Sequence, residues 1–327
     1  MAPMDDMQDI RAAGETANPN VYDIVATDDR VLPLAVEALD LRGRAVRLGP
    51  ALNAILSRHD YPPAVSRLVG QAVLLAAMIG SAMKFKGRFI LQTQTNGPVD
   101  MIVADFSTPN QLRGYARFDA DAVSALPGDE PEALIGEGYL AFTIDQGEHM
   151  QRYQGIVPLE GGDLVAAAHA YFEQSEQIPT RLKLAVAETM ERGGATAWRA
   201  GGLMVQHLPS DGGHPRDLDP GDGSGGTPDD PAWEEAVAFV ETVEDHELAD
   251  PDLSSEELLY RLFHERGVRV FDGQSLVEDC GCSRERLLAA MQGFSDEEKD
   301  SIVKDGAVEA TCEFCGTVYR FEADELA

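Results

Sequence analysis

Cysteine is absent from the first 279 residues of this 327-residue chain. All four cysteines lie in the last 48 positions, at Cys280, Cys282, Cys312 and Cys315. Basic residues are scarce, since 26 Lys and Arg stand against 57 Asp and Glu and the formal charge is −31. Such a surface repels nucleic acid and anionic membranes, so we expect neither as a partner. The first residues carry no basic, apolar leader, and the longest nearly apolar run, 72–83, is shorter than the ~20 residues that span a bilayer, so we expect a cytoplasmic protein.

The charges are unevenly distributed, and this divides the chain into segments. Residues 1–208 carry 26 acids and 17 bases, whereas residues 209–327 carry 31 acids and nine bases. Asp, Gly and Pro fill 16 of the 22 positions 210–231, a composition too poor in apolar side chains to form a core. We therefore predict a flexible tail at 1–20, a core domain at 21–208, a flexible and helical linker at 209–273, and a small cysteine-bearing domain at 274–327.

Helix-like and strand-like patterns form separate blocks within the core domain. Two β-rich runs are joined by the turn signal Asn96-Gly97-Pro98 and followed by a third, which predicts an antiparallel meander. Because helices and strands do not alternate as βαβ units, the predicted class is α+β, a mixed sheet domain followed by a helical linker. The predicted strands are 89–95, 99–106, 111–118, 139–144, 153–157, 181–186 and 197–206. The predicted helices are 49–58, a longer one from Pro63 to Met83, and 164–175.

The linker contains two amphipathic patterns. Trp233, Val237, Val240 and Val243 recur at helical spacing among acidic residues, and a second helix is predicted from 254 or 255 to 265. Two interpretations of the first apolar stripe stay open: it packs permanently on the core domain, or it is covered only conditionally. The glycine-rich run 221–226 lacks the Lys-Ser/Thr of a phosphate-binding loop, so we interpret it as linker.

The four cysteines form two close pairs, C-x-C and C-x₂-C, separated by 29 residues. Four soft thiolates brought together by folding suit tetrahedral zinc, which predicts one Zn²⁺ per chain bound by Cys280, Cys282, Cys312 and Cys315. A unit of about 50 residues has too little apolar core to fold alone, so metal binding and folding should be coupled.

Three interpretations of the cysteines are possible. A permanent structural zinc knuckle is the plainest. The C-x-C spacing favours a thiol switch, since a disulfide across so small a ring would be strained and labile. A thioredoxin-type oxidoreductase has little support, because the strand-CxxC-helix context is missing.

Enzyme chemistry has no clear signature in the chain. No HExxH or other catalytic spacing appears among the histidines, so we predict that the protein is not an enzyme. His264, 16 positions before Cys280, is the histidine that could lie near the metal. The seven histidines are His59, His149, His169, His207, His214, His246 and His264.

Five other segments accompany the two cysteine motifs, which are followed by Ser283-Arg284-Glu285-Arg286 and by Gly316. In sequence order these segments are His59-Asp60-Tyr61-Pro62, Asn96-Gly97-Pro98, Arg152-Tyr153-Gln154-Gly155-Ile156-Val157, Ser175-Glu176-Gln177-Ile178-Pro179-Thr180-Arg181 and Leu262-Phe263-His264-Glu265. In these residues, and in their order, the chain resembles the 33 kDa chaperonin family, the redox-regulated heat-shock holdases of bacteria. The resemblance covers roughly residues 22–325 and departs in the N-terminal tail and at 210–231.

The resemblance implies an ATP-independent stress-response chaperone that is inactive while reduced and zinc-bound. Oxidation would form the disulfides Cys280–Cys282 and Cys312–Cys315, expel zinc, unfold the linker and yield homodimers that hold unfolding client proteins. Loss of a zinc contribution of about 10–16 kcal/mol exceeds the stability of almost any 50-residue unit, so the C-terminal domain must unfold. If the linker helices rest partly on that domain, their docking weakens as well.

Overall fold

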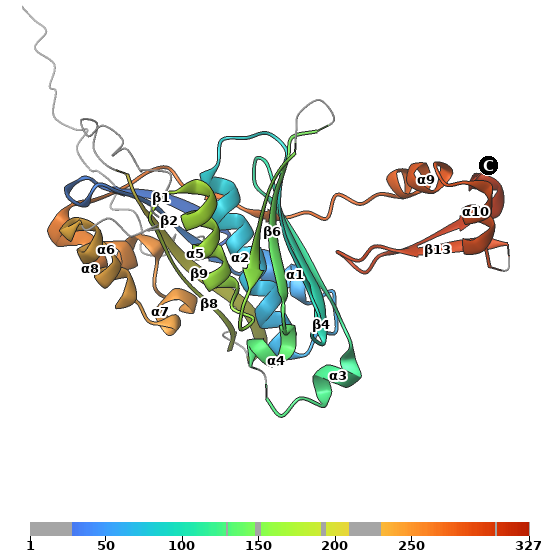
Figure 1. Cartoon of the computed structure of the whole chain (residues 1–327), viewed down its shortest axis with the longest axis horizontal. Helices are drawn as coiled ribbons and strands as arrows, with labels where there is room; N and C mark the ends of the chain where they lie inside the picture. The colour runs from blue at the N-terminus through green and yellow to red at the C-terminus, as the bar shows by residue number, and fades with distance from the viewer. Residues whose placement is uncertain are drawn as a thin grey trace, which may run out of the picture.

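The computed structural model describes residues 28–128, 130–147, 152–190, 194–208, 230–304 and 306–326. The predicted tail at 1–20 and nearly all of the predicted insert 210–231 lie outside these residues. Two β-sheets enclose a long helix, three helices cover one sheet, and a small C-terminal unit projects from the other end (Figure 1). The class is α+β, as predicted from the separation of helices and strands.

The first sheet is antiparallel and has the order β10-β1-β2-β9-β8. The two-residue strand β11 also pairs with β1. Strands β1 and β2 were not among the predicted elements, because most of their residues are apolar or buried and the two-residue alternation is obscured. The strands are β1 (Arg30–Val36), β2 (Leu41–Leu48), β8 (Thr180–Met190), β9 (Thr196–His207), β10 (Val268–Val270) and β11 (Gln274–Ser275).

The second sheet has the order β12-β5-β4-β3-β6-β7. It contains the predicted meander. Strands β3 and β4 pair antiparallel across the turn at Asn96-Gly97-Pro98, and β4 in turn pairs antiparallel with β5. Only β12 joins in parallel, at the edge of β5. The strands are β3 (Arg88–Thr95), β4 (Val99–Ser107), β5 (Gln111–Phe118), β6 (Gly138–Asp145), β7 (Tyr153–Leu159) and β12 (Val277–Glu278).

Helix α2 (Pro63–Ala82) forms the centre of the core domain and contacts strands of both sheets. The close approach needs glycine: a Cβ at Gly70 would lie 2.7 Å from Val186, and one at Gly114 would lie 2.6 Å from Val73. Helix α2 agrees with the helix predicted from Pro63 to Met83. The whole helix, unlike the apolar run 72–83 alone, is long and apolar enough to cross a membrane. However, 78% of its apolar window is buried inside the protein, as in a core helix.

The remaining helices of the core domain are short. Predicted helix 49–58 is α1 (Pro50–Leu56), and predicted helix 164–175 is α5 (Leu164–Tyr171), which continues as a π-helical turn over Phe172–Glu176. Two one-turn helices, α3 (Ala120–Ser124) and α4 (Pro131–Ile135), were not predicted.

Three linker helices cover the outer face of the first sheet: α6 (Pro231–Glu241), α7 (Asp245–Ala249) and α8 (Ser255–Phe263). The predicted apolar stripe is largely buried there, with Trp233 at 3% and Val240 at 0% exposure. The stripe packs on β1, β2, β8 and β9, and the cluster includes none of the C-terminal residues that the structure describes, 280–304 and 306–326. Buried Arg47 of β2 adds a polar clamp, because its guanidinium donates to the backbone carbonyls of Asp250 and Leu253.

A strap, residues 268–279, leads from α8 to the cysteines. It pairs first with β1, through β10 and β11, and then crosses to the other sheet, where β12 pairs with β5. Each pairing involves only two or three residues. The strap therefore joins the linker helices to the C-terminal unit by a series of short contacts.

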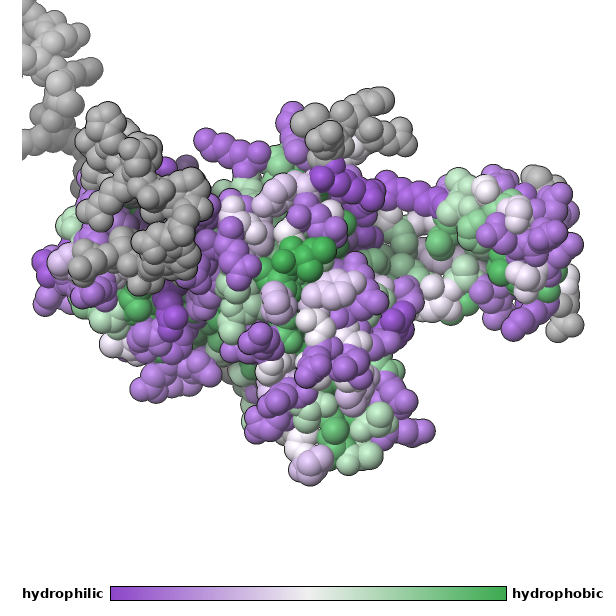
Figure 2. Space-filling model, in the orientation of Figure 1, coloured by the Kyte–Doolittle hydropathy of each residue, from purple (hydrophilic) through white to green (hydrophobic). Residues whose placement is uncertain are grey.

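The C-terminal unit comprises α9 (Arg284–Gln292), α10 (Asp296–Ile302), and a hairpin of β13 (Ala307–Thr311) and β14 (Val318–Glu322), followed by a 3₁₀ turn at Ala323–Leu326. The residues between the two cysteine pairs predict two short helices, 283–291 and 295–303, followed by a strand near Val308. Helices α9 and α10 and strand β13 agree with this prediction, whereas β14 was not predicted. Its core contains four buried side chains, those of Met291, Val308, Phe321 and Leu326. Figure 2 shows hydrophobic residues on its surface among hydrophilic ones, and Phe294 and Val318 are 42% and 58% exposed.

Candidate metal centre

Two turns carry the four cysteines. Cys280 and Cys282 follow β12, separated by Gly281, whose φ of +63° suits glycine. Cys312 and Cys315 lie in the turn of the β13–β14 hairpin. That turn is closed by hydrogen bonds from the Gly316 amide to the Cys312 carbonyl, 2.8 Å, and from the Cys312 amide to the Thr317 carbonyl, 2.9 Å. Backbone hydrogen bonds therefore fix the hairpin turn that carries the second cysteine pair.

The four Sγ atoms lie within 4.8 Å of one another, and all four cysteines are free thiols. The Sγ atoms of Cys280 and Cys312 are 3.4 Å apart, as are those of Cys282 and Cys315. Zn–S bonds of about 2.3 Å in a tetrahedron place sulfurs roughly 3.8 Å apart, so the cluster fits a thiolate-bound metal. Within the part of the chain that the structure describes, it is the one group of three or more Cys, His, Asp or Glu side chains with metal-binding spacing.

Hydroxyl groups surround the sulfurs on the hairpin side. Tyr319 Oη lies 3.2 Å from Cys282 Sγ, and Thr317 Oγ1 lies 3.2 Å from Cys315 Sγ. Burial opposes ionisation of Cys315, but hydrogen bonds with Thr317 and with the neighbouring thiols outweigh it and lower the Cys315 pKa to about 6. Burial raises the pKa of Cys280 and of Cys312. The cluster thus combines one readily ionised thiol, Cys315, with two thiols, Cys280 and Cys312, whose ionisation a bound cation would favour.

The cysteine turns dock on the core domain through Phe314. The guanidinium of Arg113 lies 3.9 Å from the centre of the Phe314 ring, and Tyr115 meets that ring edge-on at 4.7 Å. His59 Nε2 lies 3.1 Å from the Phe314 carbonyl oxygen. Arg113 also donates from Nη1 to the Cys280 carbonyl at 2.9 Å. One arginine therefore contacts both cysteine turns.

Arg113 is itself fixed by a buried carboxylate. Asp105, 2% exposed, lies directly across the β4–β5 pair and accepts hydrogen bonds from Arg113 Nε at 2.7 Å and Nη2 at 2.5 Å. Burial raises the pKa of Asp105, and the charge of Arg113 opposes that rise. The guanidinium plane is thereby held toward the metal centre.

The four cysteines stand in two recognisable motifs, whereas the surface on which they dock has no motif in the sequence. Arg113 and Tyr115 lie two residues apart on one face of β5, an ordinary strand pattern with no motif. His59 belongs to the segment His59-Asp60-Tyr61-Pro62, which contributes to the family resemblance but predicts no role for this histidine. His264 is not in the cysteine cluster: its Nδ1 lies 3.1 Å from the Tyr260 carbonyl of its own helix.

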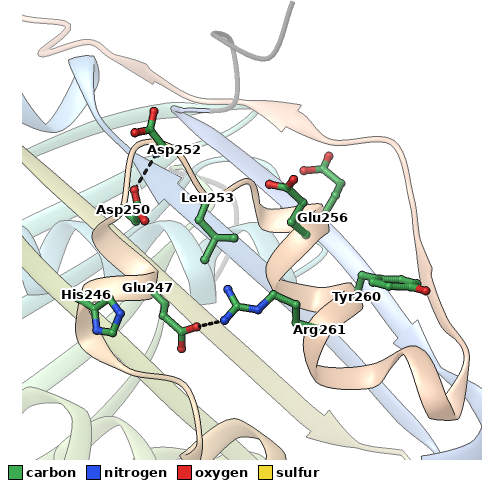
Figure 3. Close-up of a pocket in the computed structure, with 9 residues that line it drawn as sticks. His246, Glu247, Asp250, Asp252, Leu253, Glu256, Tyr260 and Arg261 are labelled. Carbon is green, nitrogen blue, oxygen red and sulfur yellow. Dashed lines mark hydrogen bonds and ion pairs between the residues drawn. The ribbon is translucent and has the colours of Figure 1, made fainter. Parts of the chain in front are cut away.

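A hollow of about 690 Å³ lies between α7 and α8 (Figure 3). Glu247 points across it to Arg261, and the two form an ion pair of 2.7 Å. The hollow is lined by His246, Glu247, Asp250, Asp252, Leu253, Glu256, Glu257, Tyr260 and Arg261. It is an open acidic surface on the linker helices, separate from the cysteines, and we assign it no ligand.

Comparison with known proteins places this architecture among known chaperones. The family described as Hsp33 protein matches residues 29–322. The 33 kDa chaperonin of Caulobacter vibrioides is 44% identical over 302 residues, covering 90% of this chain and 95% of that protein. The 33 kDa chaperonin of Nitrosococcus oceani is 39% identical, covering 89% and 90%. The crystal structure of the 33 kDa chaperonin from Thermotoga maritima shares the fold, with a TM-score of 0.70 at 22% identity over 91% of this chain and 96% of that one.

Proposed function

This chain belongs to the Hsp33 family, and from that premise we propose that it is a redox-regulated, ATP-independent holdase of the bacterial cytoplasm. In this proposal the reduced, zinc-loaded protein is inactive, and the oxidised protein binds unfolding proteins during stress and prevents their aggregation. It performs no enzymatic reaction. The observation that carries the proposal is the convergence of four free thiols on one small, weakly packed unit.

Cys280, Cys282, Cys312 and Cys315 would hold one Zn²⁺ per chain. When bound, the metal would keep the four sulfurs as thiolates at neutral pH and tie the two turns together. Tyr319 and Thr317, each 3.2 Å from a sulfur, would donate hydrogen bonds to thiolates. Four thiolates complete a tetrahedral shell, so no further ligand is required from the core domain.

The switch would be the formation of Cys280–Cys282 and Cys312–Cys315. Each pair of thiolates gives up two electrons as its S–S bond forms. For each disulfide, one molecule of hydrogen peroxide takes up the two electrons and two protons from the buffered solvent and becomes two molecules of water. Disulfides within the pairs would remove all four thiolate donors, and they would leave the two turns with neither a shared metal ion nor a disulfide between them. By contrast, Cys280–Cys312 and Cys282–Cys315, whose sulfurs are 3.4 Å apart, would keep the turns joined.

Unfolding would then spread through the strap. Its pairings with β1 and β5 involve two or three residues each, so they depend on anchors at both ends. Once the cysteine end is free, the strap can peel away and release α8 and α6, whose buried apolar residues include Phe263 and Val240. Exposed apolar surface binds non-native chains and allows the active protein to form homodimers.

The experiment follows zinc, thiols and activity together. Reduced protein should contain close to one zinc and four free thiols, and should not prevent aggregation of a chemically denatured client. After peroxide treatment, zinc and thiols should approach zero, peptide mapping should find the two within-pair disulfides, and aggregation should be suppressed without ATP. A permanent structural zinc knuckle, the alternative function, would keep its metal under peroxide and behave identically in both states.

A further inference from the structure

The outer edge of β5 is covered by the protein's own chain. The Val277 amide donates to the Asn110 carbonyl and the Asp279 amide to the Leu112 carbonyl, both at 3.0 Å, so residues 277–279 form an added parallel strand. This pairing ends at Leu112, although β5 continues to Phe118. Beyond Leu112, the side chains of Arg113 and Tyr115 contact the ring of Phe314, which comes from a different part of the sequence.

Phe314 is half-buried, and its ring contacts Arg113 and Tyr115 of the core domain. Its ring lies between the guanidinium of Arg113 and the ring of Tyr115, and its carbonyl oxygen lies against His59. An arginine over an aromatic face and an edge-on aromatic neighbour are interactions that any exposed phenylalanine or tyrosine can make.

The charges across this contact are complementary. Arg58 of the core pairs with Glu278 of the strap at 2.7 Å, and Gln111 donates to Asp279 at 2.5 Å. Burial and a hydrogen bond to Glu313 raise the pKa of Tyr115 to about 12. On a chain whose net charge is −31, the core domain thus presents basic side chains to the acidic residues that lie near Phe314.

We propose that this surface, formed by His59, Arg58, Gln111, Arg113 and Tyr115 and called here the β5 edge site, binds an extended segment of a non-native protein that carries an aromatic residue beside acidic ones. The segment adds to β5 as a parallel strand and places its aromatic ring on Arg113. In this structure residues 277–279 and Phe314 occupy the site in its place. The inference rests on the proposed holdase function and specifies how a client is held.

The position of Arg113 links site occupancy to the cysteines. Arg113 contacts the Cys280 carbonyl and the Phe314 ring, so it holds both turns only while the turns are together. When the turns separate, the contacts of Arg113 with the Cys280 carbonyl and with the Phe314 ring no longer support each other. Each is weak alone, so the β5 edge becomes free. A client segment, continuous in sequence, can then bind the strand edge and the aromatic position at once.

The test uses a fluorescein-labelled peptide, Val-Glu-Asp-Ser-Glu-Phe-Ser, and fluorescence anisotropy with the full-length protein. Oxidised wild type should bind it at least tenfold more tightly than reduced, zinc-loaded protein. Peptides with Phe replaced by Ala, or with the three acids replaced by Lys, should bind oxidised protein at least tenfold more weakly. Equal binding of the three peptides would overturn the site.

Two variants separate the site from the fold. Phe314→Ala leaves the four cysteines and the core domain intact and frees the aromatic position on Arg113. The reduced variant, with its zinc content verified, should bind the peptide more tightly than reduced wild type but more weakly than oxidised wild type, because residues 277–279 still pair with β5. Arg113→Gln should lose peptide binding and client protection when oxidised. Its matched control, Arg117→Gln, lies on the same face of β5 and pairs with Asp100, so it should keep both activities.

The outcomes distinguish this site from the proposed function. If oxidised wild type prevents aggregation while Arg113→Gln protects clients equally well, the β5 edge site is wrong and the holdase function stands. If oxidised wild type binds the peptide but does not prevent aggregation, the peptide site stands and the holdase function is wrong.

Discussion

The core domain and the C-terminal unit are stabilised in different ways. Helix α2 is buried along most of its length between two sheets, and its cluster includes residues from both of them. The C-terminal unit has four buried side chains in its cluster, and α10 buries none. The first region therefore folds by apolar burial, whereas the second depends on what joins its two cysteine turns.

The linker helices belong with the first region. Their apolar residues pack on the outer face of the first sheet, and this packing agrees with both interpretations of the stripe, permanent and conditional. The hydrophobic cluster that they form there includes no described residue of the C-terminal unit. Any signal from the cysteines must therefore travel along the strap or through Phe314. Substitutions in the two regions should therefore differ in their effects on stability and on client protection.

The largest effect is expected from removing two sulfurs of the cluster. Cys312→Ser with Cys315→Ser should remove a metal contribution of about 10–16 kcal/mol and unfold residues 284–326. Hydrogen exchange should show complete loss of protection there, with β3, β4 and β6 unchanged. Thr317→Ser, which keeps a hydroxyl beside Cys315, is the control. Retained protection in the double variant would show that the unit folds by burial after all.

A smaller but still large effect is expected from placing a charged side chain in the apolar stripe of the linker. Val240→Asp places a carboxylate at a fully buried position on the first sheet and should cost on the order of 3 kcal/mol, enough to release α6. The reduced variant should keep its zinc yet prevent aggregation of a denatured client, and α6 should lose exchange protection.

Ala238→Asp is the control for that variant, because it lies on the exposed face of the same helix and should behave as wild type. If Val240→Asp loses α6 protection but protects clients only after oxidation, exposure of the stripe is not what activates the protein.

The smallest effect is expected from removing the N-terminal cap of one helix in each of the two regions. Ser254 caps α8 and Ser295 caps α10, each in a capping box with a glutamate three residues later. Ser→Ala should cost about 1 kcal/mol at either site. In α10, which buries no residue, that loss should speed local amide exchange roughly fivefold. In α8, Leu259 and Phe263 hold the helix on the sheet, so its amides should change little.

Amide exchange measured helix by helix checks this prediction. Equal acceleration in α8 and α10, or a larger one in α8, would contradict the view that packing holds one helix and capping the other.

Local signals in the sequence account for much of the fold. The Asn96-Gly97-Pro98 turn and the flanking β-rich runs predicted β3, β4 and β5, since hairpin geometry depends on a few adjacent residues. Ser254 and Ser295 marked the starts of α8 and α10 for the same reason. Strands β1, β2 and β14 and the strap were missed, because short or doubly covered strands depend on distant partners.

The sequence by itself determined the chemistry of this protein: four thiols in two close pairs, a long apolar helix, and acidic amphipathic linker helices. These features follow from residue type and spacing alone. Tertiary structure decided where they act. It placed the linker stripe on the first sheet, carried the strap across to β5, and brought Phe314 to Arg113, 201 positions earlier in the chain. Contacts between such distant residues depend on the whole topology of the two sheets, which no local pattern encodes.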